Sequence, residues 1–263
     1  MIAALPRTVL SLSPKEGAGL GDVVAWLDGL LTNTVRGDGV SFAALLTPQG
    51  KIIADMFVTP DGDRLLLDTT PEMGLELKKR LAMYVLRAPV AVEDVSGSVR
   101  VYRVWDTDQD MGMDDPRHAS AGRRRLGGVM PTDASEADWD AFRLSLGLPD
   151  SQFDFGPGEV FPADADMDEL HGVDYRKGCF IGQEVVSRMH RMSTVKKRMR
   201  AVILSAEAKD GDVLKAGERR VGDVLHVRGK MGMALVRLER LAAAQTGLNV
   251  NGEPAEVMAG PNG

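Results

Sequence analysis

The residues best suited to chemistry lie in one short stretch, residues 175–188, which reads YRKGCFIGQEVVSR and is hereafter the cysteine segment. Its Cys179 is the only cysteine in the sequence of 263 residues. Gly178 and Gly182 flank Cys-Phe-Ile, so the backbone can turn on both sides of this apolar insert and come close to another chain or a ligand. The pattern predicts a reactive thiol or, alternatively, a small hydrophobic residue buried beside Phe180.

The residues around Cys179 favour its thiolate form. Residues 183–189 have helix-forming character, so Gly182 is expected to mark a helix N-terminus. Cys179 would then lie just before the positive end of the helix dipole, with Arg176 and Lys177 beside it. Both influences stabilise a thiolate, so the sequence supports the reactive alternative.

Positive charge is concentrated in and after the cysteine segment. Residues 176–200 contain eight arginines and lysines and a single acid, Glu184, in a chain of formal net charge −6. Glu184 and Arg188 have the spacing of a supporting ion pair on a helix, and the basic run can be a solvated face or an anion site. The negative charge of the whole chain argues against general nucleic-acid affinity, so nucleic acid is not an expected partner.

Composition predicts a folded chain in a reducing compartment. Apolar residues make up 44% and charged residues 27% of the sequence, enough to bury a large core. A single cysteine excludes an internal disulfide framework and a zinc ribbon. No stretch approaches the roughly 18 apolar residues of a membrane helix, and the N-terminus lacks the apolar run of a secretory signal. We therefore expect a cytoplasmic protein without a membrane partner.

Hydrophobic periodicity predicts a mixed α+β arrangement over most of the chain. Alternating or apolar runs predict strands, and apolar residues at intervals of three and four predict amphipathic helices. Helices are expected at residues 21–34, 71–84 and 134–146, and strands at 42–46, 52–58, 64–68, 90–95 and 98–105.

The pattern changes after the basic run. Short strand candidates separated by Gly and Asp follow from about residue 199, which predicts a small C-terminal β-barrel or sandwich. We therefore divide the chain into an α+β domain at 1–199 and a β-barrel at 200–263. Before that boundary, the acidic stretch 106–115 is expected to be a mobile loop. Acids at alternate positions can suggest calcium, but the twelve-residue calcium-loop pattern is absent.

The cysteine segment carries a specific resemblance. KGCFIGQE at 177–184, with Arg188 four residues on, resembles the signature K-G-C-[FY]-x-G-Q-E-x-x-x-R of the YgfZ family of folate-binding proteins. WLDGLLTN at 26–33 and LLTPQGKIIADM at 45–56 are similar to further family motifs, and the resemblance extends nearly end to end. It implies an accessory factor for iron–sulfur proteins, built on the scaffold of the glycine-cleavage T-protein.

The T-protein itself, an aminomethyltransferase that uses tetrahydrofolate, is the alternative that the resemblance leaves open. Where it has R-L-E-A-G, this chain has Arg143-Leu-Ser145-Leu-Gly, so a hydroxyl replaces an acid expected to hold the pterin ring. A hydroxyl pairs more weakly and with less direction than a carboxylate, so ordinary T-protein catalysis is not expected. Asp55 corresponds to the T-protein's acidic segment beside the folate amine, where a carboxylate can assist proton transfer, or it is a polar residue closing a strand.

The resemblance also implies a central cavity for tetrahydrofolate or a derivative, with the basic run available for the glutamate tail. The implied partners are iron–sulfur client or assembly proteins. Four ligands normally hold a cluster, so one cysteine and four histidines imply no metal site of the chain's own and an accessory role rather than conventional turnover. The implied catalytic residues are Cys179, with Lys177 tuning it, and Asp55. The implied folate-binding residues are Asn33, Arg143, Gly178, Gly182, Gln183, Glu184, Arg188, Arg191 and Lys197.

Overall fold

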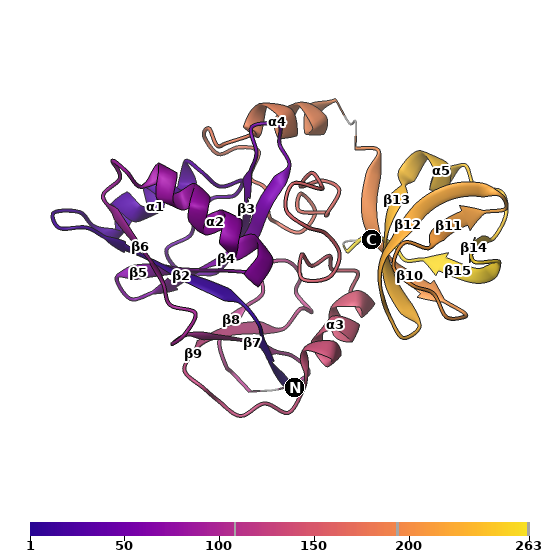
Figure 1. Cartoon of the computed structure of the whole chain (residues 1–263), viewed down its shortest axis with the longest axis horizontal. Helices are drawn as coiled ribbons and strands as arrows, with labels where there is room; N and C mark the ends of the chain where they lie inside the picture. Colours follow the sequence, from indigo (N-terminus) through magenta and orange to yellow (C-terminus); the bar gives the residue numbers. More distant parts are fainter. Residues whose placement is uncertain (108, 193–194, 262–263) are drawn as a thin grey trace.

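The computed structural model describes residues 1–107, 109–192 and 195–261. Two antiparallel sheets and a closed barrel, with helices packed beside them, confirm the predicted α+β class (Figure 1). None of the helices in these ranges is both long and apolar enough to cross a membrane.

A five-stranded sheet forms the largest part of the core. Its order is β3-β4-β5-β2-β6. The strands are β2 (Thr8–Pro14), β3 (Ser41–Leu46), β4 (Ile52–Asp61), β5 (Arg64–Thr69) and β6 (Val90–Asp94). Helix α2 (Pro71–Tyr84) starts where the Thr70 hydroxyl accepts a hydrogen bond from the Met73 amide and Pro71 takes the first turn. The helix buries Leu77 and Leu81 in the same core as the sheet.

Helix α1 (Leu20–Asp28) is shorter than the predicted helix at 21–34. The helix ends early because Thr32 makes contacts outside it. Its buried hydroxyl donates to the Gly172 carbonyl at 2.7 Å and accepts from the Ala44 amide at 2.8 Å. Residues after α1 therefore join the edge of β3 to a loop far along the sequence.

The second sheet has the order β1-β7-β9-β8. Its strands are β1 (Ile2–Leu5), β7 (Arg100–Val104), β8 (Met113–Asp114) and β9 (Arg123–Gly127), and α3 (Glu136–Ser145) packs against β1. The acidic stretch 106–115 is not simply a mobile loop as predicted, because it forms β8 and buries Asp115 between Arg103 and Arg117. Its Asp108 lies outside the described residues.

The C-terminal strands close into a barrel of order β10-β13-β12-β11-β14-β15. They are β10 (Lys197–Leu204), β11 (Val213–Ala216), β12 (Arg219–Arg228), β13 (Met231–Arg237), β14 (Leu248–Val250) and β15 (Glu253–Val257), with the short α5 (Leu238–Ala242). The barrel thus begins three residues before the predicted boundary at 200. It stands at one end of the molecule, beside α3 (Figure 1).

Two sets of ion pairs hold the barrel against the rest of the chain. On β12, His226 Nε2 and Arg228 Nε lie 2.7 and 2.8 Å from Asp140 Oδ2 on α3. On β10, Arg198 pairs with Asp166 at 2.8 Å, and Arg200 also pairs with Asp166. The buried carboxylates of Asp140 and Asp166 are therefore the docking points for the barrel.

Candidate functional site

Helix α4 (Gln183–Arg191) carries most of the cysteine segment, and Gly182 begins it as predicted. Gly182 has φ +80, and a Cβ there would lie 2.6 Å from the carbonyl oxygen of Thr47. The left-handed backbone and the contact with the turn between β3 and β4 both require glycine. Figure 1 shows α4 beside the end of β3 and β4. Gly182 therefore fixes the helix on this turn.

The side chain of Cys179 is exposed, which contradicts the buried alternative. The neighbouring Phe180 is the residue that enters the core, being only 7% exposed. No atom lies within 4 Å of a Cβ built on Gly178, so the backbone beside the thiol is open. Gln183 Nε2 donates to the Gly178 carbonyl at 3.3 Å, which ties the loop to α4 rather than leaving this amide for a ligand.

Lys177 points away from the exposed surface and anchors the segment. Its buried Nζ donates to the main-chain oxygens of Asp28, Leu31 and Asn33 at 2.6, 2.9 and 3.0 Å. Burial lowers the pKa of Lys177, while the Asp28 carboxylate at 3.1 Å opposes that shift. The ammonium thus satisfies the Asp28 carbonyl at the negative end of α1 and the carbonyls of Leu31 and Asn33 after the helix. These contacts anchor the loop, and the tuning of Cys179 by Lys177 stays a prediction.

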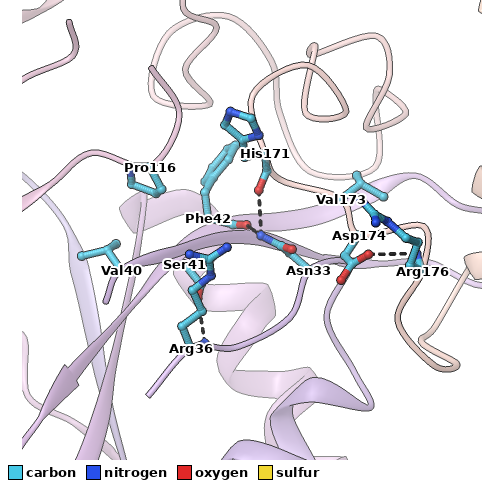
Figure 2. A pocket seen from close by; sticks show the side chains of 10 residues that line it. All are labelled: Asn33, Arg36, Val40, Ser41, Phe42, Pro116, His171, Val173, Asp174 and Arg176. Carbon is cyan, nitrogen blue, oxygen red and sulfur yellow. Dashed lines mark hydrogen bonds between the residues drawn. The ribbon is translucent and has the colours of Figure 1, made fainter. Parts of the chain in front are cut away.

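Asn33 stands on the wall of a hollow of about 680 Å³, hereafter the Asn33 hollow (Figure 2). The residues that line it come from the segment between α1 and β3, the start of β3, the loop after β8 and the loop before α4. They are Asn33, Arg36, Val40, Ser41, Phe42, Pro116, His171, Val173, Asp174 and Arg176. The sequence prediction included only Asn33 among them, because the others come from separate loops that only the fold brings together.

The Asn33 amide is a scaffold of this hollow. Its Nδ2 donates to the carbonyls of Phe42 and His171 at 2.9 and 2.7 Å, and its Oδ1 accepts from the Thr34 amide at 2.9 Å. Both side-chain atoms are therefore engaged, and Asn33 positions the wall instead of contacting a ligand through a free donor. His171 adopts the left-handed φ of 56°, an uncommon conformation for a non-glycine residue that these bonds help to hold.

Two arginines of the basic run, Arg188 and Arg198, form ion pairs with acidic side chains. Arg188 pairs with Glu184 at 3.0 Å on the exposed face of α4, the ordinary ion pair that their spacing allowed. Arg198 is held by Asp166 and Asp168, both at 2.8 Å, so the barrel and not a ligand uses its charge. Lys197 begins β10, where its backbone lies in register with Arg237, a pairing that does not engage its ammonium. The run therefore serves largely to cap α4 and dock the barrel.

A second hollow of about 480 Å³ lies along α4, lined by Tyr175, Gln183, Glu184, Ser187, His190 and Arg191. The rings of Tyr175 and His190 stack with their centroids 3.8 Å apart, which packs the loop before α4 against the helix. Arg191 Nε donates to the Ser187 carbonyl at 3.3 Å. Three predicted residues, Gln183, Glu184 and Arg191, thus share a surface with one another but not with the Asn33 hollow.

Arg143 lies in the interior and has no free face for a ligand. Its guanidinium pairs with Asp140 and Asp154 and donates to the Leu148 carbonyl at 3.1 Å, and the side chain is fully buried. The predicted folate contact of Arg143 is therefore wrong in this structure, because two buried carboxylates already neutralise it. Ser145 is exposed and its hydroxyl donates to the Phe142 carbonyl of its own helix at 2.6 Å.

Asp55 is also enclosed. It accepts a hydrogen bond from the Ser151 hydroxyl, and burial together with the nearby Asp150 raises its pKa. Around it, the interior is filled by charged side chains that the sequence analysis did not identify. The guanidinium centres of Arg124, Arg103 and Arg117 lie 3.5, 4.9 and 5.0 Å from the ring centroid of Phe57.

The comparisons with known proteins agree with this architecture. Residues 196–259 match the family model described as "CAF17, C-terminal beta-barrel domain". The crystal structure of glycine cleavage system aminomethyltransferase T from Bartonella henselae aligns with 99% of this chain and 85% of its own, at a TM-score of 0.74 and 14% identity. At that identity the likeness shows the fold alone, which is that of the T-protein.

Curated relatives add sequence similarity over most of the chain. An iron–sulfur cluster assembly factor IBA57 homologue from Mycosarcoma maydis is 30% identical over 68% of this chain, which spans about half of that relative, 52% of its length. The human IBA57 protein is 26% identical over 84% of this chain and 74% of its own. These matches support a relationship to the CAF17/IBA57 family with a T-protein-like fold. Both relatives are named mitochondrial, which contradicts the cytoplasmic location predicted from the sequence.

Proposed function

We propose that this chain is a folate-binding accessory factor for the assembly, maturation or repair of iron–sulfur proteins, of the YgfZ type. The observation that carries the proposal is the exposed Cys179, the only cysteine of the chain, presented on a loop that Gly182 and Lys177 fix on either side. The relatives of this chain that are named iron–sulfur cluster assembly factors support the same function.

A single thiolate cannot enclose a cluster, since a cluster normally takes four protein ligands. Among the described residues, no group of three or more His, Cys, Asp or Glu side chains could hold a metal ion. Cys179 would therefore supply one ligand at an interface, while a partner protein supplies the others. An exposed thiol on a well-anchored loop suits such a shared site, because it can reach a partner without local unfolding.

The Asn33 hollow supports the folate part of the proposal. Its volume falls within the range of small-molecule sites. Its lining is mainly polar, with Val40, Phe42, Pro116 and Val173 as the apolar residues. It lies at the end of the WLDGLLTN motif and is joined to the cysteine segment through Asp174 and Arg176. Folate bound there would contact the same loop that presents Cys179.

The T-protein-like fold keeps aminomethyl transfer as the second candidate function. Two contacts weigh against aminomethyl transfer. The Arg143 guanidinium is already paired with Asp140 and Asp154, and the exposed Ser145 hydroxyl donates to its own helix, so neither side chain is placed to bind a pterin ring. Purified protein should be assayed for methylene transfer from an aminomethyl-lipoyl carrier to tetrahydrofolate. Robust turnover would favour the transferase over the accessory factor.

The proposed function is tested with Cys179→Ala and Cys179→Ser in cells that lack the wild-type protein. Both variants should fold and melt like wild type, since the side chain is exposed, yet fail to restore the activities of iron–sulfur enzymes. Restoration by either variant at normal protein levels would show that the thiol is dispensable and would overturn the assignment.

A further inference from the structure

We propose that Arg36 and Arg176 bind the glutamate carboxylates of the folate ligand, so that the Asn33 hollow recognises the acidic end of the molecule. This rests on the proposed function, because it takes folate as the ligand. Arg188, Arg198 and Arg200, later in the basic run, are engaged in ion pairs, so the proposal assigns the folate tail to Arg36 and Arg176 instead.

The two arginines differ from most arginines near the site in being unpaired. Within the described residues, neither guanidinium has a hydrogen bond or an ion pair, whereas Arg188 pairs with Glu184 and Arg198 with Asp166 and Asp168. Figure 2 shows the guanidinium end of Arg36 directed into the hollow. A guanidinium offers a planar fork of donors that matches a carboxylate in two-point contact.

The floor of the hollow suits the flat part of such a ligand. Phe42, Val40 and Val173 line the hollow and are 3, 8 and 8% exposed, so each presents a small apolar surface to it while its bulk lies in the core. Pro116 adds a further apolar wall. A ring system could contact these apolar side chains, and Arg36 and Arg176, which line the same hollow, could then bind the charged tail.

The polar walls are already organised before a ligand arrives. Asn33 holds the His171 carbonyl, and the Thr32 hydroxyl holds that of Gly172, which fixes this wall against the β3 edge. Asp174 is the only acid that lines the hollow in the described structure, and its two oxygens accept from the Thr34 hydroxyl and the Arg176 amide, both at 2.8 Å. Two arginines and one satisfied carboxylate leave the hollow net positive.

The test compares two ligands that differ only in the tail, 5-formyltetrahydrofolate and 5-formyltetrahydropteroate, which lacks the glutamate. Isothermal titration with the full chain should show that wild type binds the glutamate form at least about tenfold more tightly. Arg36→Gln and Arg176→Gln should each remove most of that preference without weakening the pteroate form. Arg219→Gln, an exposed arginine on the barrel, is the matched control and should bind both ligands like wild type.

The outcomes separate this inference from the proposed function. If wild type binds both ligands equally, or if the two glutamine variants keep the full preference, the arginines do not bind the tail, although folate binding stands. If neither wild type nor any variant binds either ligand, the folate part of the proposed function is wrong. The thiol part still stands if the Cys179 variants do not restore the activities of iron–sulfur enzymes in cells.

Discussion

The ammonium nitrogen of Lys177 donates a hydrogen bond to the main-chain oxygen of Asn33 across 3.0 Å. This contact joins a wall of the Asn33 hollow to the loop that presents Cys179, since Lys177 is separated from Cys179 by one residue. Arg176 lies on the other side of Lys177 and lines the same hollow. A ligand in the hollow and a partner at the thiol would therefore act on one anchored stretch of backbone.

Lys177→Met is expected to destabilise the fold by about 2–3 kcal/mol. The methionine keeps much of the buried stem but leaves the oxygens of Asp28, Leu31 and Asn33 without their charged donor. Urea denaturation monitored by circular dichroism measures the change. An unchanged unfolding midpoint, combined with a large change in Cys179 alkylation rate, would instead support the tuning role predicted from the sequence.

Cys179 should react with a bulky thiol reagent in the native protein, to one equivalent, at a rate within about tenfold of that in urea. Because the chain has no other cysteine, the released chromophore reports this one site. Folate in the Asn33 hollow should change the native rate but not the rate in urea. A thiol that reacts only after denaturation would show that the loop is covered in solution.

The fold was largely predictable from the sequence because the relevant patterns are local. Apolar runs located β3, β4 and β5, and the change to short strand candidates after residue 199 placed the domain boundary at 200, three residues after β10 begins. Gly182 was predictable as a helix start for the same reason. Helix α1 ended early because Thr32 is bound to Gly172, a contact between residues far apart in sequence that no local pattern encodes.

The candidate site was less predictable, because a sequence motif does not show which acidic side chain each arginine will pair with in the fold. Arg143 was a predicted folate contact and Arg198 belongs to the basic run that was expected to bind the glutamate tail, yet each is neutralised by aspartates from other segments. Arg36 lies outside the motifs, and Arg176 was expected only to stabilise the Cys179 thiolate, although the fold places both on one hollow. The missing information was the pairing of charges, which depends on tertiary structure.

Asp140→Asn should loosen the barrel and reduce the acid sensitivity of the fold. Burial alone would raise the pKa of Asp140, but its contacts with His226, Arg143 and Arg228 outweigh burial and hold the pKa below the usual value. The stability that this carboxylate contributes is thus complete above about pH 4 and is lost as the pH falls through its depressed pKa. At pH 7 the variant should lose about 3 kcal/mol, because a buried pair is broken.

Thermal melting at pH 7, 4 and 3 measures this effect, and Asp223→Asn is the control. Asp223 pairs with Arg220 within the barrel, at the surface, so its loss should matter little at any of these pH values. If the melting temperatures of wild type and Asp140→Asn fell equally as the pH is lowered, the contact of Asp140 with His226 and Arg228 would not be the source of the acid sensitivity.

Alanine should destabilise the protein at Gly182 but not at Gly178, two glycines of the cysteine segment. Gly182→Ala must place a Cβ 2.6 Å from the Thr47 carbonyl on a backbone of φ +80, so it should cost about 2 kcal/mol or shift the start of α4. Gly178→Ala meets no atom within 4 Å and has an ordinary φ, so its stability should stay within about 0.5 kcal/mol of wild type. Denaturation gives both values, and the Cys179 labelling rate reports whether the loop has moved. If Gly182→Ala matched Gly178→Ala in both measurements, Gly182 would not be the residue that fixes the position of the thiol.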